Sequence, residues 1–238
     1  MSSYYRASAN KTPEFPSLMG DVVADICIVG AGYTGLSSAL HLAEKGYKVA
    51  VLEAETVGFG ASGRNGGHVG IGQRQDQQYL EEAFGNEVAT LLWHMSLEAI
   101  DTVKELIKKH RIKCDLKHGN VHFAHRSKYT RDLEEEVDFL QDRYDFDQID
   151  YLPKSRLSEV IDSDAYYGAV VDRASKHLHP LNFLLGLAAA AVKAGVVIYE
   201  NSRVTSYEGA PAVVKTTGGR ITADEMILAC NGYIERLE

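Results

Sequence analysis

The fold of this chain is decided by residues 25–53, which read DICIVGAGYTGLSSALHLAEKGYKVAVLE. The short apolar run at 25–29 predicts a buried strand, and apolar residues at helical spacing within 36–43 predict a helix. Residues 48–53 predict a second buried strand. A strand, a helix and a strand within about 30 residues form the βαβ unit of a parallel sheet. The sequence therefore predicts an α/β fold.

The turn between the first strand and the helix carries the pattern G-x-G-x-x-G, which is typical of a dinucleotide site in this context. The first glycine permits a tight turn, the second lets a pyrophosphate approach the backbone, and the third lets helix and strand pack closely. The free N–H groups at the start of the helix favour phosphates. The alternative is a purely structural glycine turn. The candidate nucleotide-binding residues of the turn are Gly30, Ala31, Gly32, Tyr33, Thr34 and Gly35.

The second strand ends at Glu53, which is followed by Ala54. A carboxylate at this place can accept hydrogen bonds from both hydroxyls of a ribose, and it would repel a 2′-phosphate. We therefore expect Glu53 and Ala54 to contact a dinucleotide, and we do not expect NADP.

A second glycine-rich segment begins five residues after Glu53, with seven glycines in residues 58–72. An NAD enzyme has no need of such a loop. In a flavin enzyme the chain must follow the pyrophosphate and ribityl chain toward the isoalloxazine ring, and small residues permit that approach. The segment thus predicts FAD, with a flexible surface loop as the alternative. The candidate residues are Gly60, Ala61, Ser62, Gly63, Arg64, Asn65, Gly66 and Gly67.

The segments GAGYTGLSSALHLAEKG (30–46) and GFGASGRNGG (58–67) resemble the FAD-dependent D-amino-acid-oxidase-like superfamily. HLHPLNF (177–183) and ILACNGY (227–233) narrow the resemblance within it, and it covers essentially the whole chain. The resemblance implies a Rossmann-like FAD-binding domain with a parallel sheet, together with part of an interleaved α+β substrate domain. It also implies four further FAD contacts, which are Val204 at the adenine and Cys230, Asn231 and Gly232 near the pyrophosphate.

The same resemblance implies an FAD-dependent oxidoreductase that oxidises the C–N bond of a small-molecule amine in putrescine catabolism. Ammonia and peroxide would be released, with dioxygen as the electron acceptor. Two alternatives stay open: an amine or amino-acid dehydrogenase of the same superfamily that passes electrons to a carrier, and a fragment without activity. An NAD-binding module is a distant third, because of the glycine loop after Glu53.

Residues 1–75 and 165–238 are expected to form the FAD-binding domain, with 76–164 as an inserted part of the substrate domain. Residues 1–20 are expected to form an irregular arm, and residues 220–224 and 226–230 two separate strands, the second of them buried. No helix follows that last strand, although an open α/β sheet needs both faces covered. We therefore expect a C-terminally truncated chain that folds poorly alone and lacks the last FAD-binding segment.

One histidine is a catalytic candidate. His68 follows the double glycine of the loop, where it could position an amine near the flavin, or could instead be a solvated or packing residue. His122 and His125 are expected on opposite faces of one strand, which excludes a shared metal. His177 and His179 are interpreted as marking the start of a helix at 181–194. The sequence therefore predicts no metal.

Composition limits the partners. The chain has 25 basic and 33 acidic residues among 238, and the net charge of −8 argues against nucleic acid, which needs a basic face. The longest nearly unbroken apolar run, 184–192, is far shorter than the roughly 20 residues of a membrane span. The sequence thus predicts a cytoplasmic protein. Cys27 and Cys230 are expected to be inert thiols in buried strands, and Cys114 has no activating neighbour in the sequence.

Overall fold

The computed structural model describes residues 3–11 and 14–236, and the chain folds as two compact units. The first unit comprises Met1–Gly66, Leu106–Cys114 and His179–Glu238, and the second comprises Gly67–Glu105 and Asp115–Leu178. Residues 1–2 and 12–13 of the expected arm lie outside the described residues. Within the rest of the arm, α1 (Tyr4–Ala7) forms one short helix. No helix within residues 3–11 and 14–236 is long and apolar enough to cross a membrane.

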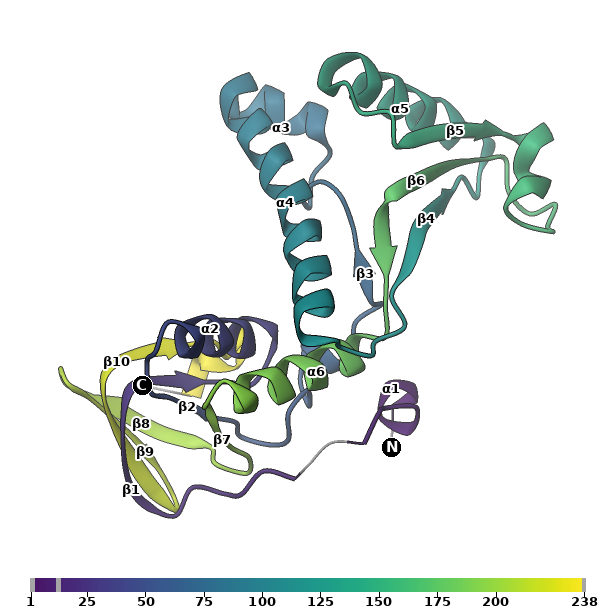
Figure 1. Cartoon of the computed structure of the whole chain (residues 1–238). Helices are drawn as coiled ribbons and strands as arrows, with labels where there is room; N and C mark the ends of the chain where they lie inside the picture. The colour runs from purple at the N-terminus through teal and green to yellow at the C-terminus, as the bar shows by residue number, and fades with distance from the viewer. Residues whose placement is uncertain (1–2, 12–13, 237–238) are drawn as a thin grey trace. The chain divides into compact units, whose positions relative to one another are not determined.

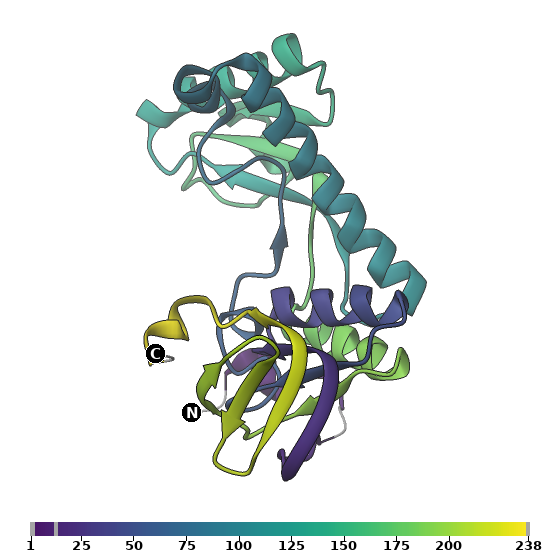
Figure 2. The ribbon, with the colours of Figure 1, turned by 90° about the vertical axis from the view of Figure 1, so that its left-hand side faces the viewer.

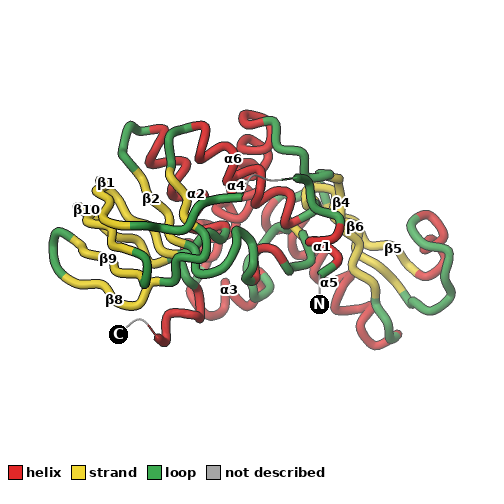
Figure 3. Tube along the Cα trace, turned by 90° about the horizontal axis from the view of Figure 1, so that it is seen from below, coloured by secondary structure: helices red, strands yellow, loops and turns green. Residues whose placement is uncertain are grey.

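The first unit is built on a sheet of six strands in the order β7-β2-β1-β10-β9-β8 (Figure 1). Its strands are β1 (Gly20–Val29), β2 (Val49–Leu52), β7 (Val197–Tyr199), β8 (Val204–Glu208), β9 (Ala212–Thr216) and β10 (Gly219–Leu228). Strands β7, β2, β1 and β10 run parallel. Strands β9 and β8 continue the sheet as an antiparallel hairpin, whose loop is visible in Figure 3. The predicted α/β fold with a parallel sheet is confirmed.

Two helices, α2 (Tyr33–Glu44) and α6 (Pro180–Lys193), lie side by side along this sheet (Figures 1 and 2). The apolar residues that predicted α2, including Leu36 and Leu40, are fully buried. His179 caps α6, because its Nδ1 accepts the Asn182 N–H at 3.1 Å. The interpretation of His179 as a helix-start residue is therefore confirmed.

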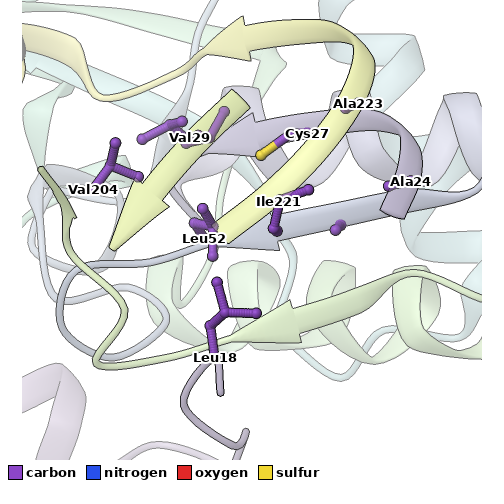
Figure 4. Packing of buried hydrophobic residues seen from close by; sticks show 10 residues of the cluster. Leu18, Ala24, Cys27, Val29, Leu52, Val204, Ile221 and Ala223 are labelled. Atoms are coloured by element: carbon purple, nitrogen blue, oxygen red, sulfur yellow. The ribbon is translucent and has the colours of Figure 1, made fainter. Parts of the chain in front are cut away.

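An apolar cluster lies on the sheet of the first unit and includes Cys27, Leu52 and Ile221. Figure 4 shows Leu18, from the arm, pointing toward the strand residues of this cluster. The arm is held there because the Leu18 N–H donates to Ser202 Oγ at 2.8 Å. Burial of these apolar side chains stabilises the sheet, and with it the positions of the loops that follow the carboxyl ends of β1 and β2.

The strand boundaries correct two predictions. The first strand begins at Gly20 rather than at residue 25, and residues 220–224 and 226–228 belong to one strand, β10, which ends at Leu228. The reason is that parallel pairing with β1 runs along the whole of β10, from Gly20↔Gly219 to Val29↔Leu228. Residues 226–230 are half-buried rather than buried.

The second unit is an antiparallel sheet with three helices. Strand β6 (Gly168–His177) pairs with β3 (His68–Val69), β4 (Lys117–Phe123) and β5 (Ile149–Pro153). The helices are α3 (Gln77–Phe84), α4 (Asn86–His110) and α5 (Thr130–Tyr144), and α4 continues into the first unit. The core of the second unit contains Trp93, Leu133, Val137, Leu140 and Phe146. Across residues 3–11 and 14–236 there are also four short 3-10 segments, η1 (Ala61–Gly63), η2 (Ser127–Tyr129), η3 (Lys154–Glu159) and η4 (Asn231–Arg236).

The unit boundaries differ from the domain boundaries expected at residues 75 and 165. Strands β3 and β6 belong to the second unit because β6 is the strand with which β3, β4 and β5 all pair. The assignment of the units to cofactor and substrate stays a prediction. Strand β4 ends at Phe123, so His125 is not on it and the argument from opposite faces does not apply. Within the described residues, no three His, Cys, Asp or Glu side chains gather as a metal site requires.

Candidate FAD-binding site

A cavity of about 480 Å³ lies in the first unit, where the parallel strands end. Its wall includes Val29 and Leu52, the last residues of β1 and β2, and Ala229, directly after β10. Ligands of open α/β sheets bind outside the carboxyl ends of the strands, and pockets for small molecules measure roughly 300–1,000 Å³. The position and size of the cavity are those of a ligand site.

Many of the predicted FAD residues line this one cavity. They are Gly30, Ala31, Gly32, Glu53, Ala54, Gly60, Ala61, Ser62, Val204, Cys230 and Asn231. The predicted residues outside its wall are Tyr33, Thr34, Gly35, Gly63, Arg64, Asn65, Gly66, Gly67 and Gly232. For this second group, as for the first, direct contact with FAD stays a prediction.

The cavity wall also contains residues that were not among the predicted FAD contacts. They are Val29, Leu52, Glu55, Gly58, Phe59, Arg203, Thr205, Ala229 and Tyr233. Most of them are next to a predicted residue in the sequence. Including the immediate neighbours of each predicted residue would therefore have found them. The Arg203–Glu55 ion pair, at 2.8 Å, joins two of these positions that lie far apart in the sequence.

The turn after β1 needs its glycines for internal packing as well as for a ligand. Gly30 has φ +106°, and a Cβ on Gly35 would lie 1.9 Å from Gly30 O. Gly32 is the N-cap of α2, has extended backbone angles and makes no side-chain cap. The first N–H groups of α2 therefore have no acceptor from their own cap residue, which is the arrangement that attracts phosphate.

The glycine loop repeats this geometry at residues 58–63, which also read G-x-G-x-x-G. Gly58 has φ +76°, and a Cβ on Gly63 would lie 2.0 Å from Gly58 O. Gly60 is the extended N-cap of η1, as Gly32 is of α2. The repeated spacing is visible in the sequence, but the prediction of this segment rested on its glycine content and not on that spacing. The two turns are joined because Ser62 Oγ accepts the Tyr33 N–H at 3.1 Å.

The Glu53 carboxylate is held at the cavity by two backbone donors. Its Oε2 accepts the Ala31 N–H at 2.9 Å, and its Oε1 accepts the Glu55 N–H at 3.0 Å. Each carboxylate oxygen can accept a further hydrogen bond. Glu53 is thus oriented in advance to receive hydroxyl donors from a ligand.

The sequence predicted Cys230 in a buried strand, but Cys230 does not lie in one, and the inertness of its thiol stays a prediction. It lies beyond the end of β10, is half-buried and lines the cavity. Burial raises the pKa of Cys230, and the nearby Glu53 carboxylate raises it further. Cys27, by contrast, is fully buried, and burial raises its pKa to about 12.

The rest of the glycine loop holds itself in place. Asn65 Nδ2 donates to Ala61 O at 3.2 Å and to Ser62 O at 3.0 Å, and the Arg64 guanidinium lies 4.8 Å from the centre of the Phe59 ring. His68 belongs to the second unit, where it is exposed and pairs with His177. A role for His68 in catalysis stays a prediction.

The cavity residues fit the ADP portion of FAD. At Gly60 a Cβ would meet only Tyr233 Cε2, at 3.7 Å, so this glycine leaves room that the protein does not fill. The uncapped start of α2 suits the pyrophosphate, and the oriented Glu53 carboxylate suits a ribose. These features come from separate segments of the chain and meet at one cavity.

Comparison with known proteins agrees with this interpretation. The profile of the DAO family, described as FAD dependent oxidoreductase, matches residues 25–238. The chain is 42% identical over 234 residues to gamma-glutamylputrescine oxidoreductase of Escherichia coli (strain K12), covering 98% of this chain and 55% of that protein. It is also 42% identical over 238 residues to a probable oxidoreductase, OrdL, of Haemophilus influenzae, covering 99% of this chain and 55% of that protein.

The fold is similar to that of the glycine oxidase of Geobacillus kaustophilus, with a TM-score of 0.76 and 24% identity. That match covers 91% of this chain and 57% of the glycine oxidase chain. The chain thus spans about half the length of the curated relatives it matches.

Proposed function

Because the chain belongs to the DAO family of FAD-dependent oxidoreductases, we propose that it is the FAD-holding part of an enzyme that oxidises the C–N bond of gamma-glutamylputrescine. The proposed substrate rests on one observation, the 42% identity to the E. coli gamma-glutamylputrescine oxidoreductase over 98% of this chain. The Glu53 carboxylate, oriented at the cavity, supports the placement of the cofactor.

In this proposal the chain's residues bind and orient FAD. Glu53 accepts hydrogen bonds from the ribose hydroxyls, the N–H groups at the start of α2 bind the pyrophosphate, and Val204 contacts the adenine. Gly60 leaves space for the phosphates, and the loop after it leads toward the flavin. Bound FAD supplies the acceptor for the hydride that leaves the carbon next to the amine nitrogen.

In the whole enzyme, oxidation of the amine would give an imine, which water would hydrolyse to an aldehyde and ammonia. Dioxygen, as the electron acceptor, would be reduced to peroxide, and the enzyme would act in putrescine catabolism in the cytoplasm. His68 is the candidate for positioning the amine. It is exposed and begins β3, so a substrate could reach it.

The test begins with the absorption spectrum of the purified chain after addition of FAD and desalting. Retained flavin is then exposed to gamma-glutamylputrescine under nitrogen, and loss of its visible absorption is followed. The E. coli relative serves as the positive control. Peroxide formed when air is admitted identifies the acceptor as dioxygen.

Bleaching by gamma-glutamylputrescine but not by putrescine or glycine is the expected result. Bleaching by glycine but not by gamma-glutamylputrescine would show that the substrate is an amino acid, and would contradict the proposed substrate. Bleaching without peroxide would leave the amine substrate in place and indicate a dehydrogenase that uses an electron carrier. Retained flavin that none of these compounds bleaches would contradict the proposal.

A further inference from the structure

A second cavity in the first unit, of about 520 Å³, shares no wall residue with the FAD cavity. It lies between α6 and the segment that follows α4. Its apolar surface includes Ile112, Leu185 and Ala190, all of which are buried. The segment packs closely on α6 at Gly186, where a Cβ would lie 2.2 Å from Ile112 Cγ2. This close contact fixes the shape of the apolar surface.

The charged residues at this cavity are all basic. They are Lys11, Lys109, Arg111, Lys113 and Lys193, with His110 beside them, and no carboxylate is among the described wall residues. One carboxylate outside the wall, Glu44, lies 2.7 Å from Lys109 Nζ and 3.5 Å from His110 Nε2, and within the described part of the chain the other lysines and Arg111 have no ion pair. Burial lowers the pKa of His110, so the positive charge at neutral pH comes from the lysines and the arginine. A concave surface of one charge sign, in a chain of net charge −8, concentrates anions.

Helix dipoles explain only part of this charge. Lys109 lies in the last turn of α4 and Lys193 in the last turn of α6, where cations stabilise a helix. Lys11 comes from the N-terminal arm, which Asn10 holds against the cavity by donating from Nδ2 to Lys113 O at 2.7 Å. Because Lys11 belongs to neither helix, stabilisation of a helix end does not explain its position at the cavity.

A buried amide adds a hydrogen-bond donor at this cavity. Asn182 lines the cavity and is only 4% exposed. Its Oδ1 accepts the Asn10 N–H at 2.7 Å, which orients the side chain. The Nδ2 of the oriented amide can donate to an anionic oxygen in the cavity.

We propose that this cavity is a binding site for a small organic anion that carries more than one negative charge and an apolar portion. The lysines and the arginine attract the charges, Asn182 donates a hydrogen bond, and the apolar portion contacts Ile112 and Leu185. The site is separate from the FAD cavity, so a ligand there would act on the protein without displacing the cofactor.

The test uses benzene-1,3,5-tricarboxylate as the probe and the neutral benzene-1,3,5-tricarboxamide as its matched ligand, with binding measured by calorimetry in the presence of excess FAD. One variant carries Lys11→Gln, Lys113→Gln and Lys193→Gln, which remove three exposed charges of the cavity. The control variant carries Lys45→Gln, Lys48→Gln and Lys108→Gln. These three lysines are also exposed, belong to the same unit and lie outside the cavity wall.

We expect the tricarboxylate to bind the unchanged chain, to bind at least tenfold more weakly to the cavity variant, and to keep its affinity for the control variant. Added salt should weaken the binding, because the attraction is between charges. Equal weakening in both variants, equal binding of the neutral triamide, or no binding by the unchanged chain would overturn the proposal. Circular dichroism of both variants verifies that each is folded.

Discussion

Two short turns of the first unit have the same glycine spacing and the same backbone geometry, yet they are followed by different structures. In both, the first glycine has a positive φ and the third leaves no room for a Cβ against the carbonyl of the first. In both, the middle glycine is an extended N-cap that lines the cavity. The turn at 30–35 leads into the twelve residues of α2, and the turn at 58–63 leads into the three residues of η1.

The difference in length between α2 and η1 shows which of the two turns can attract phosphate through a helix dipole. A helix of several turns has aligned peptide dipoles and free N–H groups at its start, whereas a single 3-10 turn has almost no dipole to contribute. The outer glycines of both turns are required by internal contacts. Of the middle glycines, Gly60 has room where a side chain would be, whereas a Cβ on Gly32 would lie 3.0 Å from Ser62 Oγ.

The largest expected effect is on stability, when the two third glycines are compared. Gly35→Ala should lower the free energy of unfolding by about 3 kcal/mol, because its Cβ meets a backbone oxygen and α2 is packed on the sheet. Gly63→Ala meets a similar contact on a three-residue turn that can move, so about 1–2 kcal/mol is expected.

Thermal unfolding of both variants, with and without FAD, measures this difference, and it also tests whether the unchanged chain folds poorly alone. Gly70→Ala is the control, because it is not a predicted FAD contact and a Cβ there would make only an ordinary contact, with Ser175 Oγ at 3.8 Å. Equal losses at Gly35 and Gly63 would show that the two turns are equally rigid.

The middle glycine of the second turn should affect binding rather than stability. Gly60→Ala places a methyl group in the cavity with an ordinary contact to Tyr233 as its nearest neighbour, so the unfolding free energy should stay within about 0.5 kcal/mol. The dissociation constant of FAD should rise about tenfold, which corresponds to about 1.4 kcal/mol. Flavin fluorescence titration measures it, and unchanged affinity would remove Gly60 from the FAD site.

The link between the turns gives a smaller effect. Ser62→Ala removes the acceptor of the Tyr33 N–H, and about 1 kcal/mol of stability should be lost. Ser158→Ala, at an exposed serine of η3, is the control and should change stability little. Urea unfolding compares the two variants. Equal stability of both would mean that the two turns hold their positions without this bond.

The smallest effect concerns the thiol beside the first turn. The raised pKa of Cys230 leaves less thiolate at a given pH, so iodoacetamide should modify it more slowly than an unhindered thiol, and faster as pH rises. Added FAD should protect it. Mass spectrometry of the peptides locates the label, and the buried Cys27 and Cys114 should stay unmodified in the folded chain. Modification that FAD does not slow would place the cofactor away from Cys230.

Local sequence was sufficient for the first half of the candidate site. The turn at 30–35 and Glu53 belong to one βαβ unit, so their proximity follows from a short connection. Sequence was insufficient at the end of β10, where two strands were expected. The single strand arises from its pairing with β1, nearly 200 residues away, and no local pattern reports such a pairing. The interpretation of His125 as a strand residue failed for a similar reason, since β4 ends where its pairing with β6 ends.

The sequence by itself determined the α/β class and the choice of an FAD-type nucleotide loop, because periodicity and glycine spacing act over a few residues. Only the tertiary structure decided which glycines face the cavity, since both turns read alike until the carbonyls and side chains around them are placed. It alone also brought Arg203 to Glu55, and Lys11 to the cavity behind α6. Contacts between distant segments depend on how the whole unit packs, and that packing is not written in any one stretch of the chain.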